Sequence, residues 1–417
     1  MKIAAASATM RAPMPGAGRR PLRPGAEARP MLLCLSHLRW DFVMQRPQHL
    51  MSRAAGTMDV VFFEEPVFRP VAAPALELST QPSGVLRVVP VLPEGLGTDS
   101  TLAALRDLLD GLLQDRAPPR LVAWFYTPMA LGFADHLHPD VTVYDCMDEL
   151  SAFRGAPRAM LAMEQRLLDR ADLVFTGGRS LYEAKRGRHV HVHCFPSSID
   201  AAHFAQARGQ GAQALAEPAA MVGIPRPRIG FFGVIDERMD LALVADVARL
   251  RPDWQLVMVG PVVKIDPASL PRLPNLHWIG GQDYAALPGL LAHWDVGFMP
   301  FALNESTRFI SPTKTPEFLA AGLPVISTPV VDVVRDYGPG GGEPGLVAIV
   351  GTAAALAEQA DALLAAPRAP FLARVDARLA SQSWDLTWAR MRALILEAEP
   401  EERPGEGQAR AAEVAHA

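Results

Sequence analysis

Cysteine is scarce in this chain of 417 residues, which contains only Cys34, Cys146 and Cys194. An odd and sparse set of cysteines provides no disulfide framework and favours a reducing compartment. No two of them are spaced as Cys-x-x-Cys, so a structural zinc site is not expected. The net charge of -5 is also unfavourable for a general nucleic-acid binder.

Long apolar runs are absent as well. No stretch approaches the roughly 18 apolar residues needed to span a bilayer, and the N-terminus lacks the apolar core of a secretory signal. We therefore expect a cytoplasmic protein. Residues 1–29 contain five arginines and a single acid, Glu27. This basic segment leaves peripheral contact with the inner face of the cell membrane open.

Hydrophobic residues make up 49% of the chain, and they occur in short runs that alternate with helical patterns. Runs such as Met31–Leu35 and Leu121–Tyr126 are nearly all apolar, as is typical of parallel strands buried on both faces. Segments such as Ala159–Arg170 have helical periodicity. This alternation predicts an α/β fold with doubly wound sheets.

The pattern is interrupted once, at residues 206–227, which are rich in Gln, Gly, Ala and Pro and are predicted to be a linker. The predicted organisation is a disordered basic tail (1–29), a Rossmann-like domain (30–205), the linker, a second Rossmann-like domain (228–382), a final helix (383–398) and a disordered tail (399–417). Two such domains face each other across a cleft, and ligands of parallel sheets bind outside the carboxyl ends of the strands.

The most informative motif is the segment 311–328, which predicts a loop, a helix, a turn and a strand. Thr313 and Lys314 lie at the predicted start of the helix, where free backbone N–H groups and the lysine suit a diphosphate. Glu317 lies one turn further on and is expected to be exposed in the cleft, where it can accept from ribose hydroxyls. The alternative is a surface helix whose lysine and glutamate are merely solvated.

Two further motifs lie in the same half. Residues 229–238 predict a strand, a glycine turn at Gly233 and a polar loop that ends in Arg238, and Lys264 follows a second strand. Gly233 would allow the backbone to approach a phosphate. Because this turn does not follow the G-x-G-x-x-G pattern, a dehydrogenase is disfavoured. A plain strand-to-helix turn and a solvated lysine are the alternatives.

In the first half, two polar loops follow predicted strands. Residues 36–49 contain His37, Trp40 and Asp41, of which the indole could stack on a sugar and the other two could bind hydroxyls. Residues 144–149 contain three acids, including Asp145 and Asp148, which could serve acid/base chemistry or bind sugar hydroxyls. A structural loop and helix-capping acids are the respective alternatives.

Three histidines two residues apart, His189, His191 and His193, raise the possibility of a metal site, since alternate residues of a strand share a face. The run continues into Pro196–Asp200 and is better explained as a strand. We therefore predict no metal site.

Taken together and in order, six segments resemble glycosyltransferases of the GT-B type, in particular the glycosyltransferase group 1 type and its branch similar to teichuronic acid biosynthesis transferases. They are residues 36–50, 63–66, 144–153, 195–200, 230–238 and 307–322. The resemblance implies an acceptor-side first domain, a second domain that binds the nucleotide sugar, and a last helix, 383–398, that crosses back onto the first domain.

The resemblance also implies roles for single residues. Gly233 would belong to the diphosphate loop, Arg238 and Lys264 would stabilise the leaving diphosphate, and Glu317 would bind the donor ribose as the second acid of a Glu-x7-Glu motif. The first acid of that motif would fall at Phe309, so this chain departs from the family's pattern there.

The resemblance thus implies a hexosyltransferase-like enzyme that moves a sugar from a nucleotide sugar, UDP- or GDP-linked, to a saccharide or lipid-linked acceptor in cell-surface polysaccharide synthesis. No organic cofactor is expected. A metal is not expected either, because no Asp-x-Asp motif stands at a strand end. Family members mostly retain the anomeric configuration. If this enzyme inverts, Asp41 or Asp148 is the candidate base. A nucleotide-sugar epimerase and a non-catalytic nucleotide-sugar-binding protein remain as alternatives.

Overall fold

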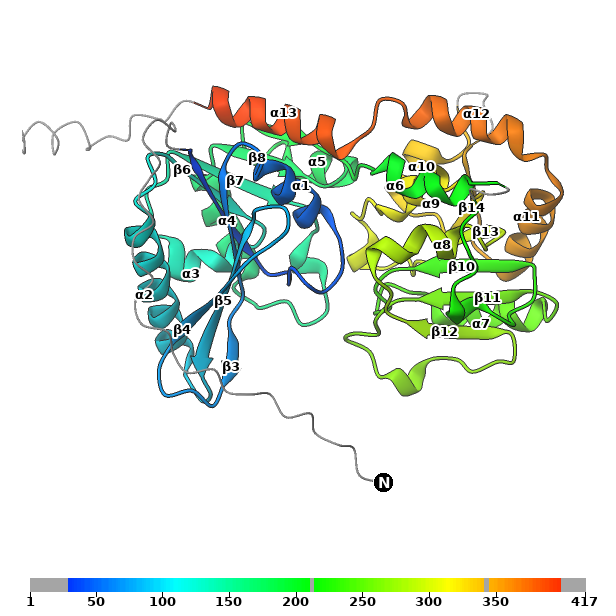
Figure 1. The fold of residues 1–417 in the computed structure, drawn as a ribbon, viewed down its shortest axis with the longest axis horizontal. Helices are drawn as coiled ribbons and strands as arrows, with labels where there is room; N and C mark the ends of the chain where they lie inside the picture. The colour runs from blue at the N-terminus through cyan, green and yellow to red at the C-terminus, as the bar shows by residue number, and fades with distance from the viewer. Residues whose placement is uncertain (1–28, 211–213, 341–344, 399–417) are drawn as a thin grey trace, which may run out of the picture.

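The computed structural model describes residues 29–210, 214–340 and 345–398. Its strands form two separate sheets, one in each half of the chain (Figure 1). The tails predicted at 1–29, apart from Arg29, and at 399–417 lie outside the described residues, as do residues 211–213 of the predicted linker.

The first sheet has the strand order β3-β5-β2-β1-β6-β7-β8-β9, and β4 pairs with β5. All its pairings are parallel except the antiparallel pair β4–β5. Its strands are β1 (Met31–Ser36), β2 (Asp59–Glu64), β3 (Val67–Arg69), β4 (Ala75–Thr80), β5 (Leu86–Pro93), β6 (Leu121–Phe125), β7 (Val141–Cys146), β8 (Leu173–Thr176) and β9 (Val192–Cys194). Strands β3 to β5 were not predicted. Strands β3 and β4 lie at the edge of the sheet, and β4 is largely exposed.

Successive residues of the central strand β1 point to opposite faces, as the strand period requires. Leu33 and Leu35 pack into one core, whereas Leu32 and Cys34 pack into another. Helices cover both faces: α1 (Arg46–Ala54), α2 (Thr98–Arg116), α3 (Leu131–Ala134), α4 (Met160–Arg170) and α5 (Arg179–Lys185). The first half is therefore doubly wound, as predicted.

The second sheet is parallel throughout, with the order β12-β11-β10-β13-β14-β15. Its strands are β10 (Arg228–Phe232), β11 (Gln255–Val259), β12 (Leu276–Gly280), β13 (Val296–Met299), β14 (Val325–Ser327) and β15 (Val347–Ile349). The accompanying helices are α6 (Ala201–Ala205), α7 (Leu241–Leu250), α8 (Leu287–Leu291), α9 (Lys314–Ala320), α10 (Val331–Tyr337), α11 (Ala353–Ala365) and α12 (Arg368–Leu379). Helices α6, α10 and α12 were not predicted.

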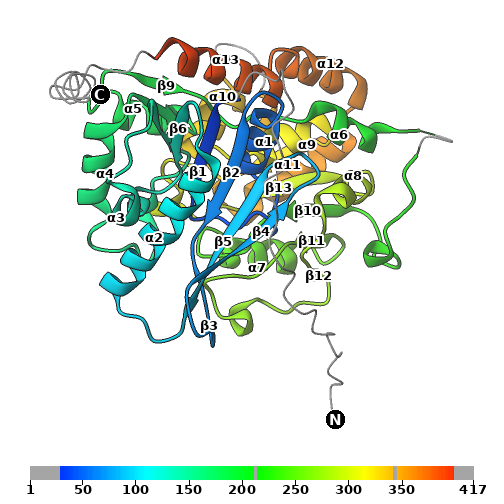
Figure 2. The same cartoon turned by 60° about the vertical axis from the view of Figure 1, so that its left-hand side comes forward.

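The last helix, α13 (Trp384–Glu397), lies on the first half of the molecule although it follows the second in sequence (Figures 1 and 2). Its buried residues Trp384, Trp388, Met391 and Ile395 join the core formed by β1, β6 and α1. The ring of Trp384 stacks on His49 of α1 at 4.8 Å between centroids. The prediction of a helix that crosses back is therefore confirmed.

None of the described helices combines the length and the hydropathy that a transmembrane segment requires. The three cysteines are free thiols, and those of Cys34 and Cys146 are buried.

Packing of α13 predicts a large loss of stability when its first aromatic ring is removed. Trp384 is only 1% exposed, so Trp384→Ala leaves a cavity and should lower the free energy of unfolding by about 3–5 kcal/mol. Leu396→Ala, at a half-exposed position of the same helix, is the matched control and should change it by less than about 0.5 kcal/mol. Chemical denaturation measures both. Equal effects of the two substitutions would contradict the docking of α13.

Candidate active site

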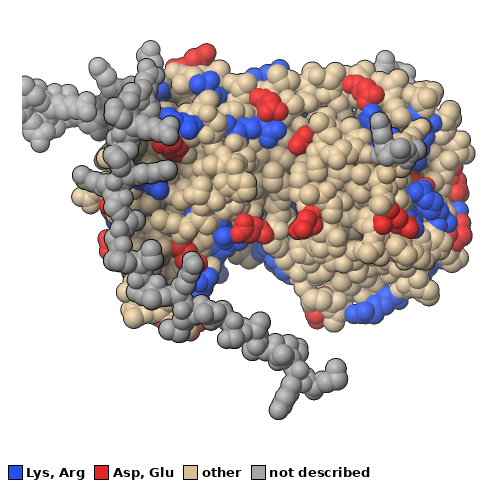
Figure 3. All heavy atoms as spheres, viewed as in Figure 1, with Lys and Arg blue, Asp and Glu red and all other residues tan. Residues whose placement is uncertain are grey.

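A cavity of about 510 Å³ lies between the two halves. From the first half it is lined by the loop after β1 and by residues that follow β7, and from the second by the turns after β10, β11 and β12 and by α9. These are carboxyl ends of parallel strands, where the sequence predicted the ligand to bind. The two halves are visibly separated by a hollow at the lower edge of Figure 3, and charged side chains of both signs are scattered over that face.

The wall formed by the second half depends on two glycines with positive φ. Gly233 has φ 135° and Gly260 has φ 149°. A Cβ atom at Gly260 would lie 1.8 Å from the carbonyl oxygen of Gly233, and a Cβ atom at Gly233 would lie 2.0 Å from Cε of Lys314. Because neither position tolerates a side chain, these glycines allow the two turns to approach each other and leave room for the lysine.

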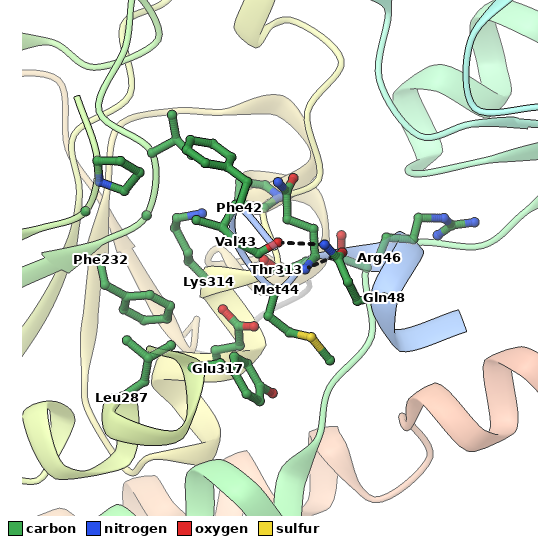
Figure 4. A pocket seen from close by; sticks show the side chains of 18 of the residues that line it. Phe42, Val43, Met44, Arg46, Gln48, Phe232, Leu287, Thr313, Lys314 and Glu317 are labelled. Atoms are coloured by element: carbon green, nitrogen blue, oxygen red, sulfur yellow. Dashed lines mark hydrogen bonds between the residues drawn. The ribbon is translucent and has the colours of Figure 1, made fainter. Parts of the chain in front are cut away.

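Lys314 and Glu317 lie one turn apart on α9 and face the Phe42–Met44 loop of the first half (Figure 4). Gly322, with φ 82°, follows this helix at the predicted position. Thr313 precedes it, and its backbone carbonyl accepts from the backbone N–H of Glu317 at 3.3 Å.

The expectation that Glu317 is exposed was wrong, since the residue is only 6% exposed. Burial raises the pKa of Glu317 to about 7, and the neighbouring Lys314 and Thr313 side chains oppose this rise. Burial also lowers the pKa of Lys314. Both groups are therefore held in a desolvated wall of the cavity, which contradicts the alternative of a solvated surface helix.

Two further cations, Arg238 and Lys264, lie over the same aromatic ring. The guanidinium carbon of Arg238 is 5.4 Å and the ammonium nitrogen of Lys264 is 4.9 Å from the ring centre of Phe153, which belongs to the first half. Arg238 also forms an ion pair with Asp236, at 2.7 Å between Nη2 and Oδ2. Lys264 has φ 61°, a conformation that costs energy in a non-glycine residue.

The carboxyl group of Asp148 lines the cavity near these cations. Burial raises its pKa, with a further contribution from Asp236, whereas Arg238 and Lys264 oppose the rise. A carboxylate with a raised pKa is a better proton acceptor than a carboxylate with an unshifted pKa, so Asp148 remains a candidate base.

Asp41, the other candidate base, also lines the cavity, but its carboxylate is engaged elsewhere. It forms an ion pair with Arg87 at 2.6 Å, and its side chain is 58% exposed. Arg87 in turn binds the buried Glu64, which also accepts from Arg39. This arrangement anchors the loop after β1 and makes Asp41 the weaker candidate.

Asp145 does not reach the cavity. Its fully buried carboxylate accepts two bonds from Arg46, each 2.9 Å long, and Arg46 also donates to the carbonyl oxygen of Phe195 at 2.7 Å. In Figure 4 the guanidinium of Arg46 points away from Lys314 and Glu317. The prediction that Asp145 contacts a substrate is therefore replaced by a positioning role, in which the ion pair fixes the start of α1.

The remaining predicted substrate-binding residues are only partly available. Trp40 lines the cavity, and its ring forms a T-shaped contact with Phe62 at 5.0 Å between centroids, so its stacking on a sugar stays a prediction. His37 is outside the cavity lining. Burial, with Lys264 nearby, lowers the pKa of His37 to about 4 and keeps the ring neutral. Its Nδ1 is buried and has no hydrogen-bond partner among the described residues.

No group of three or more His, Cys, Asp or Glu side chains in the described part of the chain is placed to hold a metal ion. Of the three clustered histidines, His189 lies within hydrogen-bond distance of the Ala171 carbonyl oxygen through Nε2, and its Nδ1 accepts from the backbone of His191.

Comparison with known proteins shows which family the second half of the chain resembles. The model for the family described as glycosyl transferases group 1 matches residues 226–366, which include Gly233, Arg238, Lys264, Lys314 and Glu317. Residues 226–366 in the second half of the chain therefore match the group 1 glycosyltransferase family.

The chain is 28% identical over 244 residues to the putative teichuronic acid biosynthesis glycosyltransferase TuaH of Bacillus subtilis (strain 168). The alignment covers 54% of this chain and 59% of that protein, so it spans somewhat less than two thirds of the relative's length.

Solved structures resemble nearly the whole chain. A sucrose-phosphate synthase from Thermosynechococcus elongatus has a TM-score of 0.62 at 16% identity and covers 88% of this chain and 99% of its own. An E. coli structure described as trehalose-6-phosphate bound with UDP-2-fluoro glucose has a TM-score of 0.62 at 11% identity, with coverages of 87% and 98%. At these identities the likeness shows the fold, which is GT-B as predicted.

Two residues at or near the cavity, Tyr284 and Phe153, were not predicted from the sequence. Tyr284 lines the cavity, stacks on His203 at 4.2 Å, and has a buried hydroxyl without a hydrogen-bond partner among the described residues. Phe153 had no predicted role although it lies over both cations. Tyr284 lies outside the motifs singled out in the sequence. Phe153 ends the segment 144–153, but nothing in that segment indicates a contact with cations, which only the packing of distant segments shows.

The raised pKa of Glu317 predicts a pH-dependent stability difference. A carboxyl group whose pKa is raised on folding stabilises the protein at low pH, and this stabilisation is lost as the pH rises through the folded pKa. Relative to Glu317→Gln, the wild-type protein should therefore lose up to about 3 kcal/mol of stability between pH 5 and pH 8. Denaturation of both proteins across this range measures the difference, and a constant difference would rule out the raised pKa.

Proposed function

We propose that this protein transfers a sugar from a nucleotide-sugar donor, UDP- or GDP-linked, to a saccharide or lipid-linked acceptor. The observation that carries the proposal is the desolvated wall formed by Gly233, Lys314 and Glu317 within a matched glycosyltransferase domain. The teichuronic acid relative supports an acceptor in cell-surface polysaccharide synthesis.

In this proposal the donor diphosphate binds beside Lys314 and Arg238. The glycine at 233 gives the phosphates access to the backbone, and the negative charge of the diphosphate favours the protonated form of Lys314, whose pKa burial has lowered. Glu317 accepts hydrogen bonds from the two ribose hydroxyls. The diphosphate and the ribose would thus both be bound by groups that already lie in the cavity wall.

As the bond to the sugar breaks, negative charge grows on the leaving diphosphate. Arg238 and Lys264 supply positive charge for this step, and the partly buried site makes their contribution larger than it would be in water. The acceptor enters from the side of the Phe42–Met44 loop, which lines the cavity opposite α9. The half-exposed side chains of Phe42 and Met44 suit an acceptor with an apolar part.

We further propose that the enzyme retains the anomeric configuration, for which no dedicated base is needed. Inversion would instead require a base at the acceptor hydroxyl, and Asp148 is then the candidate. The configuration of the product, determined by NMR spectroscopy, distinguishes the two.

A thermal-shift screen with UDP-, GDP- and dTDP-sugars identifies the donor, because a ligand that binds only the folded protein raises Tm. Incubation of that donor without an acceptor then tests the alternatives. Conversion of the sugar to its epimer would favour a nucleotide-sugar epimerase, and binding without hydrolysis or transfer would favour a non-catalytic binding protein.

Substitutions on α9 should separate binding from chemistry. Glu317→Gln keeps the shape but weakens the acceptor for the ribose hydroxyls, so the donor Kd should rise by about one to two decades. Lys314→Ala should lower kcat more strongly, because the diphosphate gains its additional negative charge only as its bond to the sugar breaks. Calorimetry and steady-state kinetics measure these effects.

The matched control for these substitutions is Glu305→Gln, at a side chain that is 79% exposed in the same half. It should leave both the donor Kd and kcat unchanged. If Glu317→Gln binds the donor as tightly as the wild-type protein, the assignment of Glu317 to the ribose fails.

We also propose that transfer is independent of divalent metal, because Arg238 and Lys264 place two cations where a metal would act. Activity should survive an excess of EDTA with less than about a twofold change in kcat. A loss of activity that Mn²⁺ or Mg²⁺ restores would contradict this, provided that EDTA leaves the Tm unchanged.

A further inference from the structure

A second cavity, of about 180 Å³, lies at the boundary of the two halves and is called here the hinge cavity. Arg179 and Phe195 line it from the first half, Asp336 and Arg378 from the second, and Arg390 from α13. Helices α5 and α10 and the connection between α12 and α13 meet there (Figure 1). Among the residues that the structure describes, only Ser197 lines both this cavity and the cleft.

Three guanidinium groups and one carboxylate line the hinge cavity. Arg179 forms an ion pair with Asp336, at 2.9 Å between Nε and Oδ1. Arg378 lies over the ring of Tyr337 at 5.1 Å and donates to the backbone carbonyl of Asp336 at 3.5 Å. Neither Arg378 nor Arg390 has a carboxylate partner within the described ranges, so the cavity carries an excess of positive charge.

The neighbouring charges do not remove this excess. Asp332, on the same helix as Asp336, accepts from the backbone N–H of Ser180 at 3.1 Å, and Arg335 is paired with Glu183. Hydroxyl groups add neutral donors, since Ser198, Ser381 and Thr387 also line the cavity.

We propose that the hinge cavity is a second anion site, which binds inorganic phosphate or the phosphate group of a small monoester. Guanidinium groups match the geometry of phosphate oxygens and bind them through charge-assisted hydrogen bonds. A cavity of 180 Å³ is smaller than the roughly 300–1,000 Å³ typical of sites for larger ligands. The site therefore suits a phosphate-sized group and not a nucleotide sugar.

Occupancy of the hinge cavity should affect the whole molecule, because its walls come from both halves and from the crossing segment. An anion held by Arg378 and Arg390 would tie the second half to α13, which packs on the first. Next to it, the Ser197 hydroxyl donates to the carbonyl oxygen of Ser311 at 2.6 Å, a contact that joins the halves at the edge of the cleft. Phosphate should therefore raise Tm.

Titration calorimetry of inorganic phosphate into the full-length protein tests the proposal. We expect saturable binding whose affinity falls by about tenfold or more in Arg390→Ala and in Arg378→Gln. Arg116→Ala removes an exposed arginine at the end of α2 and is the matched control, which should bind phosphate like the wild-type protein. Arg390 is also exposed, so its substitution should leave the Tm without phosphate unchanged.

A further variant separates the hinge cavity from the cleft. Arg238→Ala removes a cation from the cleft and should leave the hinge-cavity binding in place. The proposal is overturned if phosphate does not bind saturably, if binding survives both hinge-cavity substitutions, or if only Arg238→Ala abolishes it. These outcomes do not depend on sugar transfer. Titration with glycerol phosphate in parallel shows whether the site prefers a monoester to the free ion.

Discussion

The site depends on a lysine and a glutamate that share a poorly solvated wall of the cleft. Burial shifts the pKa values of Lys314 and Glu317 toward their neutral forms, and their mutual attraction only partly offsets this. The glycine at 233 provides the space for this lysine, because a Cβ atom there would lie 2.0 Å from Cε. A ligand that offers an anion to Lys314 and hydroxyl donors to Glu317 would offset the free-energy cost of burying both groups, and the proposed nucleoside diphosphate is such a ligand.

The opposite wall is held in place by contacts across the boundary between the halves. Asp332 of α10 accepts from the backbone N–H of Ser180 in the first turn of α5, and a Cβ atom at Gly178 would lie 2.4 Å from its carboxylate. Helix α13 adds the buried aromatic contact of Trp384 with His49. The distance between the two walls of the cleft is thus set by packing remote from the chemistry.

Most of the fold could be predicted because parallel strands buried on both faces are nearly all apolar. The same signal fails for β4, which is exposed and antiparallel, and for β5, which contains Pro90 and ends at Pro93. The chain positions of Lys314 and Glu317 were predictable from the helix pattern, but their burial was not.

The roles of Asp41 and Asp145 could not be predicted for a related reason. Their partners, Arg87 and Arg46, are 46 and 99 positions away in the sequence. Only the tertiary fold determines which charged groups come together. The sequence around an acidic residue therefore does not show whether its carboxylate is free or ion-paired.

Phe309 shows how one departure from a family pattern is explained by packing. It occupies the position where the resemblance leads one to expect an acid, and its ring packs against the apolar core of the first half, with Arg308 at 5.2 Å. An ionised carboxylate at this place would lose part of its hydration against an apolar surface, which costs free energy. The aromatic ring instead extends the apolar contact between the halves. In the proposed function, polar contacts to the sugar would then come from charged residues that do line the cleft, among them Asp148 and Lys314.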